Sequence, residues 1–257
     1  MADTRATMLR LSALVGERSL FENDAFRKLW LSKVLSHTPV NAVVYAMLIM
    51  VVNATGLSFF SSLFVVAYIA PTAVLGTVSG VFVDRAPKGI VLAATNAARA
   101  ALCLLLAIST DNVIIIYVIA VLFAVGSQFS GPAESAALPA IVKHEDLTSA
   151  NSLNNLGSLI SQLAGLMVLP AVFLNTVGPA PLALVCAILF AMAAFQFLLI
   201  EGLGGPISSN VQITLDEARE RFAEAWDRLT RDSISYIAVV LAVLANTTGL
   251  VIATLLP

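Results

Sequence analysis

A short charged turn is the first feature of this sequence whose residue types and spacing point to a specific role. The turn runs from Gly80 to Lys88, contains Asp84 and Arg85, and separates two long apolar runs. Cations beside a membrane-length helix decide which side of the bilayer that end faces. A carboxylate directly before a helix is favoured by the positive end of the helix dipole. We therefore expect the turn to mark topology and Asp84 to cap the helix that follows.

Arg99 is a charge deep inside one of the apolar runs. It lies about ten residues into the predicted helix, so about 15 Å along the axis at 1.5 Å per residue. An Arg at the bilayer centre costs roughly 2.5–3.5 kcal/mol, so its side chain must face other helices or water. Thr95 and Asn96 share its face of the helix. Two interpretations stay open: Arg99 borders a cavity for anionic or carbonyl groups, or it is a structural charge bonded to these neighbours.

Polar stripes predict a lined cavity in the middle of the chain. Asn151, Asn155, Ser158 and Gln162 follow 4-3-4 spacing, which places them on one helix face. Hydrogen bonds between helices explain single polar residues, whereas a stripe of four favours a face toward water. An adjacent face with Gly157, Ser161 and Gly165 predicts close helix packing. The complete set of predicted cavity residues is Asn41, Tyr45, Tyr68, Asn96, Arg99, Gln128, Asn155, Ser158 and Gln162.

Acidic residues are missing from the cores of the first six predicted helices. Asp84, Asp111, Glu134 and Glu201 all fall at predicted helix ends or in loops. A proton-coupled carboxylate is therefore expected outside this part of the protein. The two histidines do not replace it, because His144 is in a predicted loop and His37 is read as a packing residue. Paired carboxylates, HExxH and a nucleophile elbow are also missing, so we predict no enzyme activity, no metal and no cofactor.

The composition is that of a lipid-embedded protein. Of 257 residues, 59% are hydrophobic and 12% charged, and the mean hydropathy is +0.92, whereas soluble domains carry about 25% charged residues. The net charge of −2 offers no basic surface for nucleic acid. Seven segments are long enough for the roughly 20 residues that a spanning helix needs. They are Leu29–Val52, Ser58–Val83, Gly89–Ile108, Val113–Ser130, Ala150–Thr176, Pro181–Leu203 and Ile234–Leu256.

The loop charges predict the orientation. Of the 14 Lys and Arg residues, 13 lie near the N-terminus or in alternate connectors, and the remaining one is Arg99. Loops rich in such residues face the cytoplasm. We therefore predict four parts. Residues 1–25 form a cytoplasmic N-terminal segment, residues 26–203 a six-helix bundle, and residues 234–257 a seventh helix. Residues 204–233 form a cytoplasmic linker, in which Thr214–Arg231 has the spacing and the capping box of an amphipathic helix.

Three motifs together resemble the major facilitator superfamily. The Gly80-x-x-x-Asp84-Arg85-x-x-Lys88 pattern is similar to its motif A, although this chain has Pro87 and Gly89 in the second half. Segments starting at Phe26 and Pro132 resemble the bacterial branch that includes enterobactin exporters and macrolide efflux proteins. The resemblance implies secondary transport of a small molecule by alternating access, with export favoured, in a bacterial inner membrane. It also implies that motif A, through Asp84, holds a helix of the other half closed at the cytoplasmic side.

The chain differs from the family it resembles in the number of predicted helices. Members of this family have about twelve helices in two halves, whereas seven are predicted here. The helix-five motif of exporters is reduced to Gly165-Leu166 with Pro170 further on. We expect either a fragment of a full transporter or a half-transporter that pairs with a second chain. The expected partners are thus the bilayer, a small-molecule substrate and the missing half. The alternative function is a non-transporting sensor or assembly partner that keeps the bundle.

Overall fold

The computed structural model describes residues 20–203, apart from the side chains of residues 73, 74, 77 and 78. The chain divides into two compact units, Met1–Val211 and Gln212–Pro257, and all that follows concerns the first unit. The predicted amphipathic helix and the predicted seventh helix lie outside the described residues.

The described residues form an all-helical structure. Five stretches are long and apolar enough to cross a membrane, namely α2, α4, α5, the stretch His144–Leu174 and α8. The 28-residue α3 lies between the first two. All six helices predicted between residues 29 and 203 are therefore present as helices. Their bounds are α2 Asp24–Thr55, α3 Ser58–Arg85, α4 Lys88–Ile108, α5 Val113–Ile141, the 3-10 turn η1 His144–Asp146, α6 Leu147–Leu163, the π-helical turn η2 Ala164–Val168, α7 Leu169–Leu174 and α8 Pro179–Leu198.

Local capping explains where several helices begin and end. The Asn23 side chain accepts hydrogen bonds from the backbone N–H groups of Ala25 and Phe26, at 3.0 and 3.2 Å, and so starts α2. At the other end of α2, Gly56 adopts a left-handed conformation with φ 66° and its N–H donates to the Val52 carbonyl. Connectors of two to five residues join the long helices, so consecutive helices run in opposite directions.

Two predicted helix ends are wrong. The helix expected to stop at Ser130 continues to Ile141. It passes Pro132 although a proline inside a helix removes one backbone hydrogen bond and crowds the preceding turn, because Ala133, Ala137 and Leu138 beyond it repeat at helical spacing and are buried in the core. The predicted loop of residues 131–149 therefore shrinks to residues 142–146. The second error concerns α8, which ends at Leu198 and not at the predicted Leu203.

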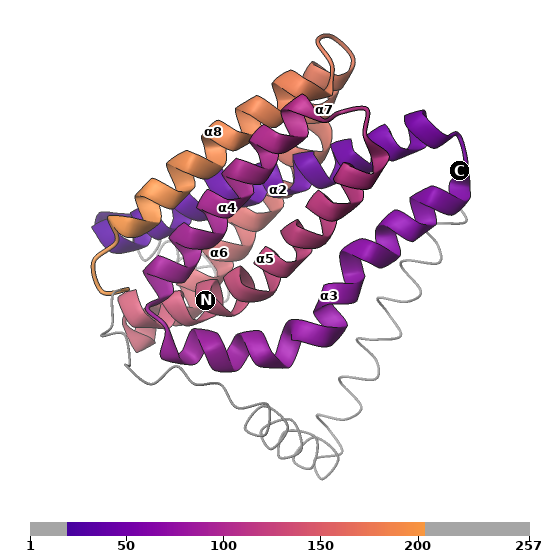
Figure 1. The fold of residues 1–257 in the computed structure, drawn as a ribbon. Coiled ribbons are helices and arrows are strands. Elements are labelled where there is room, and N and C mark those ends of the chain that lie inside the picture. The colour runs from indigo at the N-terminus through magenta and orange to yellow at the C-terminus, as the bar shows by residue number, and fades with distance from the viewer. Residues whose placement is uncertain (1–19, 204–257) are drawn as a thin grey trace, which may run out of the picture. The chain divides into compact units, whose positions relative to one another are not determined.

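Helix packing buries two separate apolar cores. α4 packs along α8 and α5, α3 packs on α5, and α2 packs on α8 and α6 (Figure 1). The first core lies near the turn of residues 84–88 and contains Phe26, Leu92, Leu138 and Phe197. The second core lies nearer the other helix ends and contains Met47, Ile116, Phe123 and Phe190. The two cores leave a layer between them, and the buried polar side chains gather in this layer.

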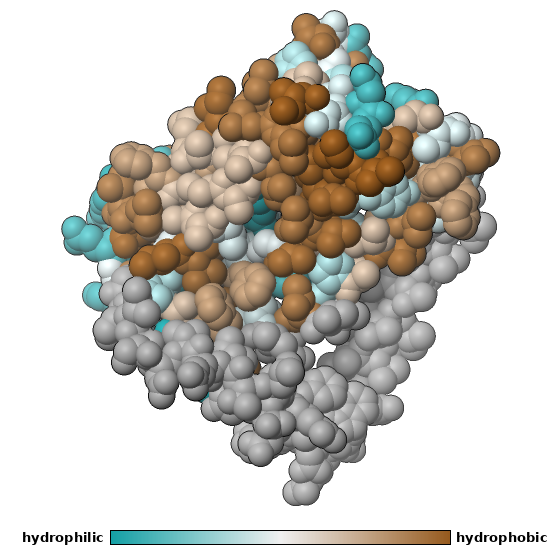
Figure 2. Space-filling view, viewed as in Figure 1, coloured by the Kyte–Doolittle hydropathy of each residue, from teal (hydrophilic) through white to brown (hydrophobic). Residues whose placement is uncertain are grey.

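The outer surface carries large apolar side chains. Figure 2 shows them spread across one face, with hydrophilic residues mainly toward the edges. Soluble monomers rarely expose contiguous apolar patches of more than a few hundred Å², whereas lipid favours such a surface. The apolar exterior therefore agrees with the helix lengths in indicating a membrane protein. Exposed members on α4, α5 and α8 include Leu104, Val118, Leu122, Ile188 and Phe195.

Candidate substrate-transport site

A polar layer divides the two apolar cores. It is built from α2, α4 and α5, and in each helix every member lies three, four or seven residues from another member. Such spacings place side chains on one face of a helix, and here the faces meet inside the bundle. The polar layer consists of Lys33, Ser36 and His37 from α2, Asn96 and Arg99 from α4, and Ser127, Ser130 and Glu134 from α5.

Arg99 is held inside the bundle by α5. Its side chain is 3% exposed, and Nη2 donates to the hydroxyl oxygens of Ser127 and Ser130, both at 3.0 Å. The guanidinium also lies 5.9 Å from the ring centroid of Phe190 in α8, which is within cation–π range. Tyr68 of α3 approaches the same group. Arg99 therefore touches α5 and α8, and its hydrogen-bond partners are serines rather than the expected Thr95 and Asn96.

Asn96 joins α4 to α2. It is fully buried, its Oδ1 accepts from the Ser36 hydroxyl at 2.6 Å, and its Nδ2 donates to the Leu92 carbonyl at 2.7 Å. Thr95 instead donates to the carbonyls of Val91 and Leu92 within its own helix. Buried polar groups with these bonds are satisfied. Asn96 thus bridges two helices inside the bundle and does not reach the surface.

A histidine and a carboxylate meet across α2 and α5. His37 Nε2 lies 2.8 Å from Glu134 Oε2. The expectation that Glu134 lies in a loop is wrong, because α5 continues past Pro132 and carries Glu134 into the bundle. The expectation that His37 is a packing residue is equally wrong, because its ring makes a polar bond. The helical spacing of Ser127, Ser130 and Glu134 is the signal in the sequence that links all three to one face.

The predicted stripe of α6 lies on the outside of the described bundle. Asn151, Asn155 and Gln162 are exposed, and Ser158 is half-buried with its hydroxyl donating to the Asn154 carbonyl at 3.1 Å. These amides therefore occupy one open face, in contrast to the buried Asn96 and Arg99. We divide the nine predicted cavity residues into two groups. The buried group is Asn96, Arg99 and Tyr68, and the open group is Asn41, Tyr45, Gln128, Asn155, Ser158 and Gln162.

The remaining predicted cavity residues lie on α2, α3 and α5. The Asn41 amide donates to the His37 carbonyl at 2.9 Å. Tyr45, one turn further, is 39% exposed and lines a hollow with residues of η2 and α7, among them Pro170. On α5, Gln128 Nε2 donates to the Thr72 hydroxyl of α3 at 2.9 Å. The open group therefore spans α2, α5 and α6, with Thr72 of α3 beside it.

Close helix packing occurs at the predicted glycines of α6 and η2. A Cβ added to Gly165 would lie 2.4 Å from the Thr38 carbonyl oxygen, and one added to Gly157 would lie 2.8 Å from Trp30 Nε1. The same Trp30 nitrogen donates to the Leu153 carbonyl at 2.9 Å. α6 and η2 therefore lie directly on α2. Gly80 of motif A differs, since a Cβ there would meet nothing within 4 Å among the described residues.

The charged turn of residues 84–88 is placed differently from the prediction. Asp84 and Arg85 form the last turn of α3, and α4 begins at Lys88 after Pro87 as its N-cap. Lys88 Nζ donates to the Asp84 main-chain carbonyl at 3.1 Å, which ties the end of α3 to the start of α4.

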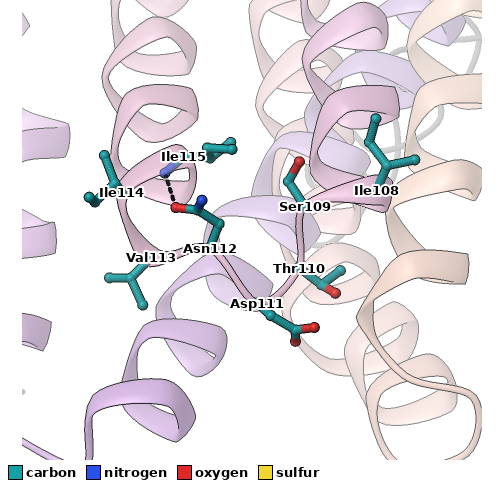
Figure 3. Close-up of a pocket in the computed structure, with 8 residues that line it drawn as sticks. All are labelled: Ile108, Ser109, Thr110, Asp111, Asn112, Val113, Ile114 and Ile115. Atoms are coloured by element: carbon teal, nitrogen blue, oxygen red, sulfur yellow. Dashed lines mark hydrogen bonds between the residues drawn. The ribbon is translucent and has the colours of Figure 1, made fainter.

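Figure 3 shows a hollow at the turn between α4 and α5. It is lined by one continuous segment, residues 108–115. Within it, Asn112 Oδ1 accepts from the Ile115 N–H at 3.2 Å and so caps α5. None of the polar layer reaches this hollow, so it is a feature of the cap. Within residues 20–203, no group of three or more His, Cys, Asp or Glu side chains is arranged to hold a metal ion.

Comparison with known families agrees with the all-helical fold and the apolar exterior. A model described as Major Facilitator Superfamily matches residues 29–257. The chain belongs to the Major Facilitator Superfamily. Comparisons with curated proteins and with solved structures gave no match. Membership of the superfamily supports membrane transport of small molecules in general.

Proposed function

We propose that this superfamily member exports a small molecule across a bacterial inner membrane by alternating access, as a secondary transporter. In this proposal the N-terminus and the turn of residues 84–88 face the cytoplasm, because the basic residues gather there. Motif A, with Gly80, Asp84, Arg85 and Lys88, then forms part of the cytoplasmic gate. A second half, from the same or another chain, covers the open group of polar residues.

The observation that carries this proposal is the polar face of α6 on an otherwise apolar exterior. Exposed amides at Asn151, Asn155 and Gln162 are unfavourable against lipid, where few hydrogen-bond partners exist. A face toward a water-filled path between two halves satisfies them. Transporter sites of this fold class lie at such an interface, near the bilayer midplane. We therefore assign the substrate path to the open group, Tyr45, Gln128, Asn155, Ser158 and Gln162 with Asn41.

The buried group is assigned a supporting role. Arg99 and Asn96 are bonded to α5 and α2, so they hold the helices that carry the open group. Tyr68 of α3 interacts electrostatically with Arg99. In this assignment a substrate meets the open amides first, and the polar layer fixes their spacing.

Accumulation of a compound panel in living cells tests the proposal. Fluorescent cationic, neutral and anionic compounds are added to cells with and without the chain, at matched amounts of membrane-inserted protein. We expect lower accumulation of at least one compound when the chain is present. Asn155→Leu combined with Gln162→Leu should reduce efflux roughly tenfold, because two lost amide hydrogen bonds, each worth about 0.7 kcal/mol, amount to about 1.4 kcal/mol. Val118→Ile with Leu122→Ile, on the apolar exterior, is the matched control and should leave efflux unchanged.

Equal accumulation of every compound with and without the chain would contradict export. The non-transporting alternative would be favoured by that result together with normal membrane insertion. Higher accumulation in cells that carry the chain would keep transport and reverse the proposed direction.

A further inference from the structure

The N-cap of α4 is a residue that cannot cap a helix with its side chain. The backbone N–H groups of the first turn of a helix have no acceptor within the helix, and an Asn, Asp, Ser or Thr at the N-cap usually supplies one. α4 has Pro87 at this position, and a proline side chain carries no oxygen. Ile90 and Val91 donate to the Pro87 carbonyl, both at 3.1 Å. The N–H of Gly89, ahead of them in the helix, therefore depends on an acceptor outside α4.

The turn that follows α8 supplies this acceptor. The Gly89 N–H donates to the Leu203 carbonyl at 3.2 Å. Leu203 is 2% exposed and Ile200 is 5% exposed, and both side chains belong to the apolar core near the turn of residues 84–88. The turn after α8 is therefore packed into the bundle, and its backbone caps a helix that lies far away in the sequence.

Two glycines make this contact possible. A Cβ added to Gly89 would lie 3.3 Å from Leu203 Cβ and 3.4 Å from the Phe197 carbonyl oxygen, so a longer side chain would push the turn away. Gly202 has a φ of 90°, which glycine adopts readily and other residues rarely adopt. A Cβ on Gly202 would come no closer than 3.8 Å to Ile141 Cγ2. Backbone strain, and not lack of space, therefore favours glycine at residue 202.

Both departures of this chain from motif A fall at this contact. Pro87 is the N-cap residue without a side-chain acceptor, and Gly89 is the residue whose missing side chain leaves room for the turn. Lys88 lies between them, and its Nζ donates to the Asp84 carbonyl at the end of α3. The turn after α8 therefore holds the segment that carries motif A.

We propose that residues 199–203 form a brace, which caps α4 through the Leu203 carbonyl and thereby positions the motif A turn. In this proposal Pro87 and Gly89 are the sequence changes that admit the brace. Gly89 and Leu203 are positioning residues, since they act on Lys88 through the backbone of α4. Only the link from the motif A turn to a gate rests on the proposed transport function. The capping contact itself requires no substrate.

Hydrogen exchange of the full chain in lipid nanodiscs, read by mass spectrometry, tests the brace. The Gly89 N–H should exchange slowly, although an N–H at this position of a helix has no partner within it. Gly202→Ala should speed exchange in a peptide of residues 86–92 roughly tenfold, because a strained brace opens more often. Gly178→Ala is the matched control. Gly178 has a φ of 91° at the other end of α8, and a Cβ there would meet nothing within 4 Å among the described residues. This variant carries similar backbone strain and should leave exchange at residues 86–92 unchanged.

Two results would overturn the proposal. One is a Gly89 N–H that exchanges in the native protein as fast as an unprotected amide. The other is equal exchange at residues 86–92 in the folded Gly202→Ala and Gly178→Ala proteins.

If Gly202→Ala fails to fold, cysteine labelling from the other side of the contact decides. Leu203→Cys places a thiol at a buried position and keeps the backbone carbonyl that caps α4. Gly89→Leu in this background should raise the rate of maleimide labelling, because the added side chain displaces the brace. Gly76→Leu in α3, where a Cβ would meet nothing within 4 Å among the described residues, should leave the rate unchanged. Equal labelling of the two double variants would overturn the brace.

The link to transport has its own readout. The brace lies at the motif A turn and not in the open group, so Gly202→Ala should lower the maximal flux of a compound found in the cell screen and leave its half-saturating concentration unchanged. Gly178→Ala should change neither quantity. Equal maximal flux in the two variants would overturn the link between the brace and the gate. A chain that transports nothing, but whose hydrogen exchange follows the prediction, would instead contradict the transport function and leave the brace standing.

Discussion

Arg99 shows at the scale of single residues how a membrane protein holds a charge. Its guanidinium donates two hydrogen bonds to α5 and lies over Phe190 of α8. Hydrogen bonds to charged groups are worth about 1.5–3 kcal/mol each. We therefore predict that Arg99→Ala lowers the free energy of unfolding by about 3 kcal/mol in mixed micelles, measured by circular dichroism during SDS titration. An effect below about 0.5 kcal/mol would contradict the structural role.

The control for this prediction is Arg27→Ala. Arg27 lies at the start of α2 and pairs with Asp24, and both side chains are more than half exposed. Exposed ion pairs contribute about 0–1 kcal/mol. The two arginine variants lose the same charge, so the difference between them reports burial and bonding.

At the scale of elements, the contact of η2 with α2 depends on Gly165. A Cβ there would lie 2.4 Å from a main-chain oxygen and 2.7 Å from Asn41 Cβ, so the backbone itself would have to move. We predict that Gly165→Ala destabilises the protein by about 1–3 kcal/mol, as overpacking does, in the same SDS titration. Gly76→Ala in α3 is the matched control, because its Cβ would meet nothing within 4 Å among the described residues. It should be neutral or stabilise by up to about 1 kcal/mol.

The elements also show what the sequence predicts well and what it does not. Long apolar runs predict membrane helices, because in lipid every backbone N–H and C=O group must be hydrogen-bonded within the protein. The helices from α2 to α8 agree with this prediction. The close contacts of Gly157 and Gly165 also follow from spacing alone. The end of α5 does not, because buried packing beyond the predicted end at Ser130 carries the helix on to Ile141. Because of this error, the predicted site lacks Glu134, which is the partner of His37.

The burial of polar residues cannot be read from periodicity either. Asn96 and Asn155 are both amides on one face of an apolar helix, yet Asn96 is fully buried and Asn155 exposed. Which face meets another helix depends on contacts between segments far apart in the sequence. Ser36 bonds Asn96 across 60 residues, and His37 bonds Glu134 across 97. Only the assembled bundle shows these pairs.

At the scale of the whole molecule, the distribution of basic residues predicts an orientation that labelling can measure. Among the described residues, the two native cysteines, Cys103 and Cys186, are buried, so new surface cysteines give a clean signal. We predict that Asp111→Cys reacts with a membrane-impermeant maleimide in intact cells, since its turn faces outward under the positive-inside rule. Glu145→Cys should react only after the cells are opened. The reverse pattern would invert the proposed orientation.

Flux through purified protein tests the central claim, which is that this bundle moves a small molecule along its polar face. The protein is reconstituted into proteoliposomes, and release of a compound selected by the cell screen is followed over time. We predict saturable release that exceeds protein-free vesicles and falls roughly tenfold with Asn155→Leu and Gln162→Leu, about 1.4 kcal/mol. Release at the protein-free rate, from vesicles with correctly inserted protein, would contradict the claim.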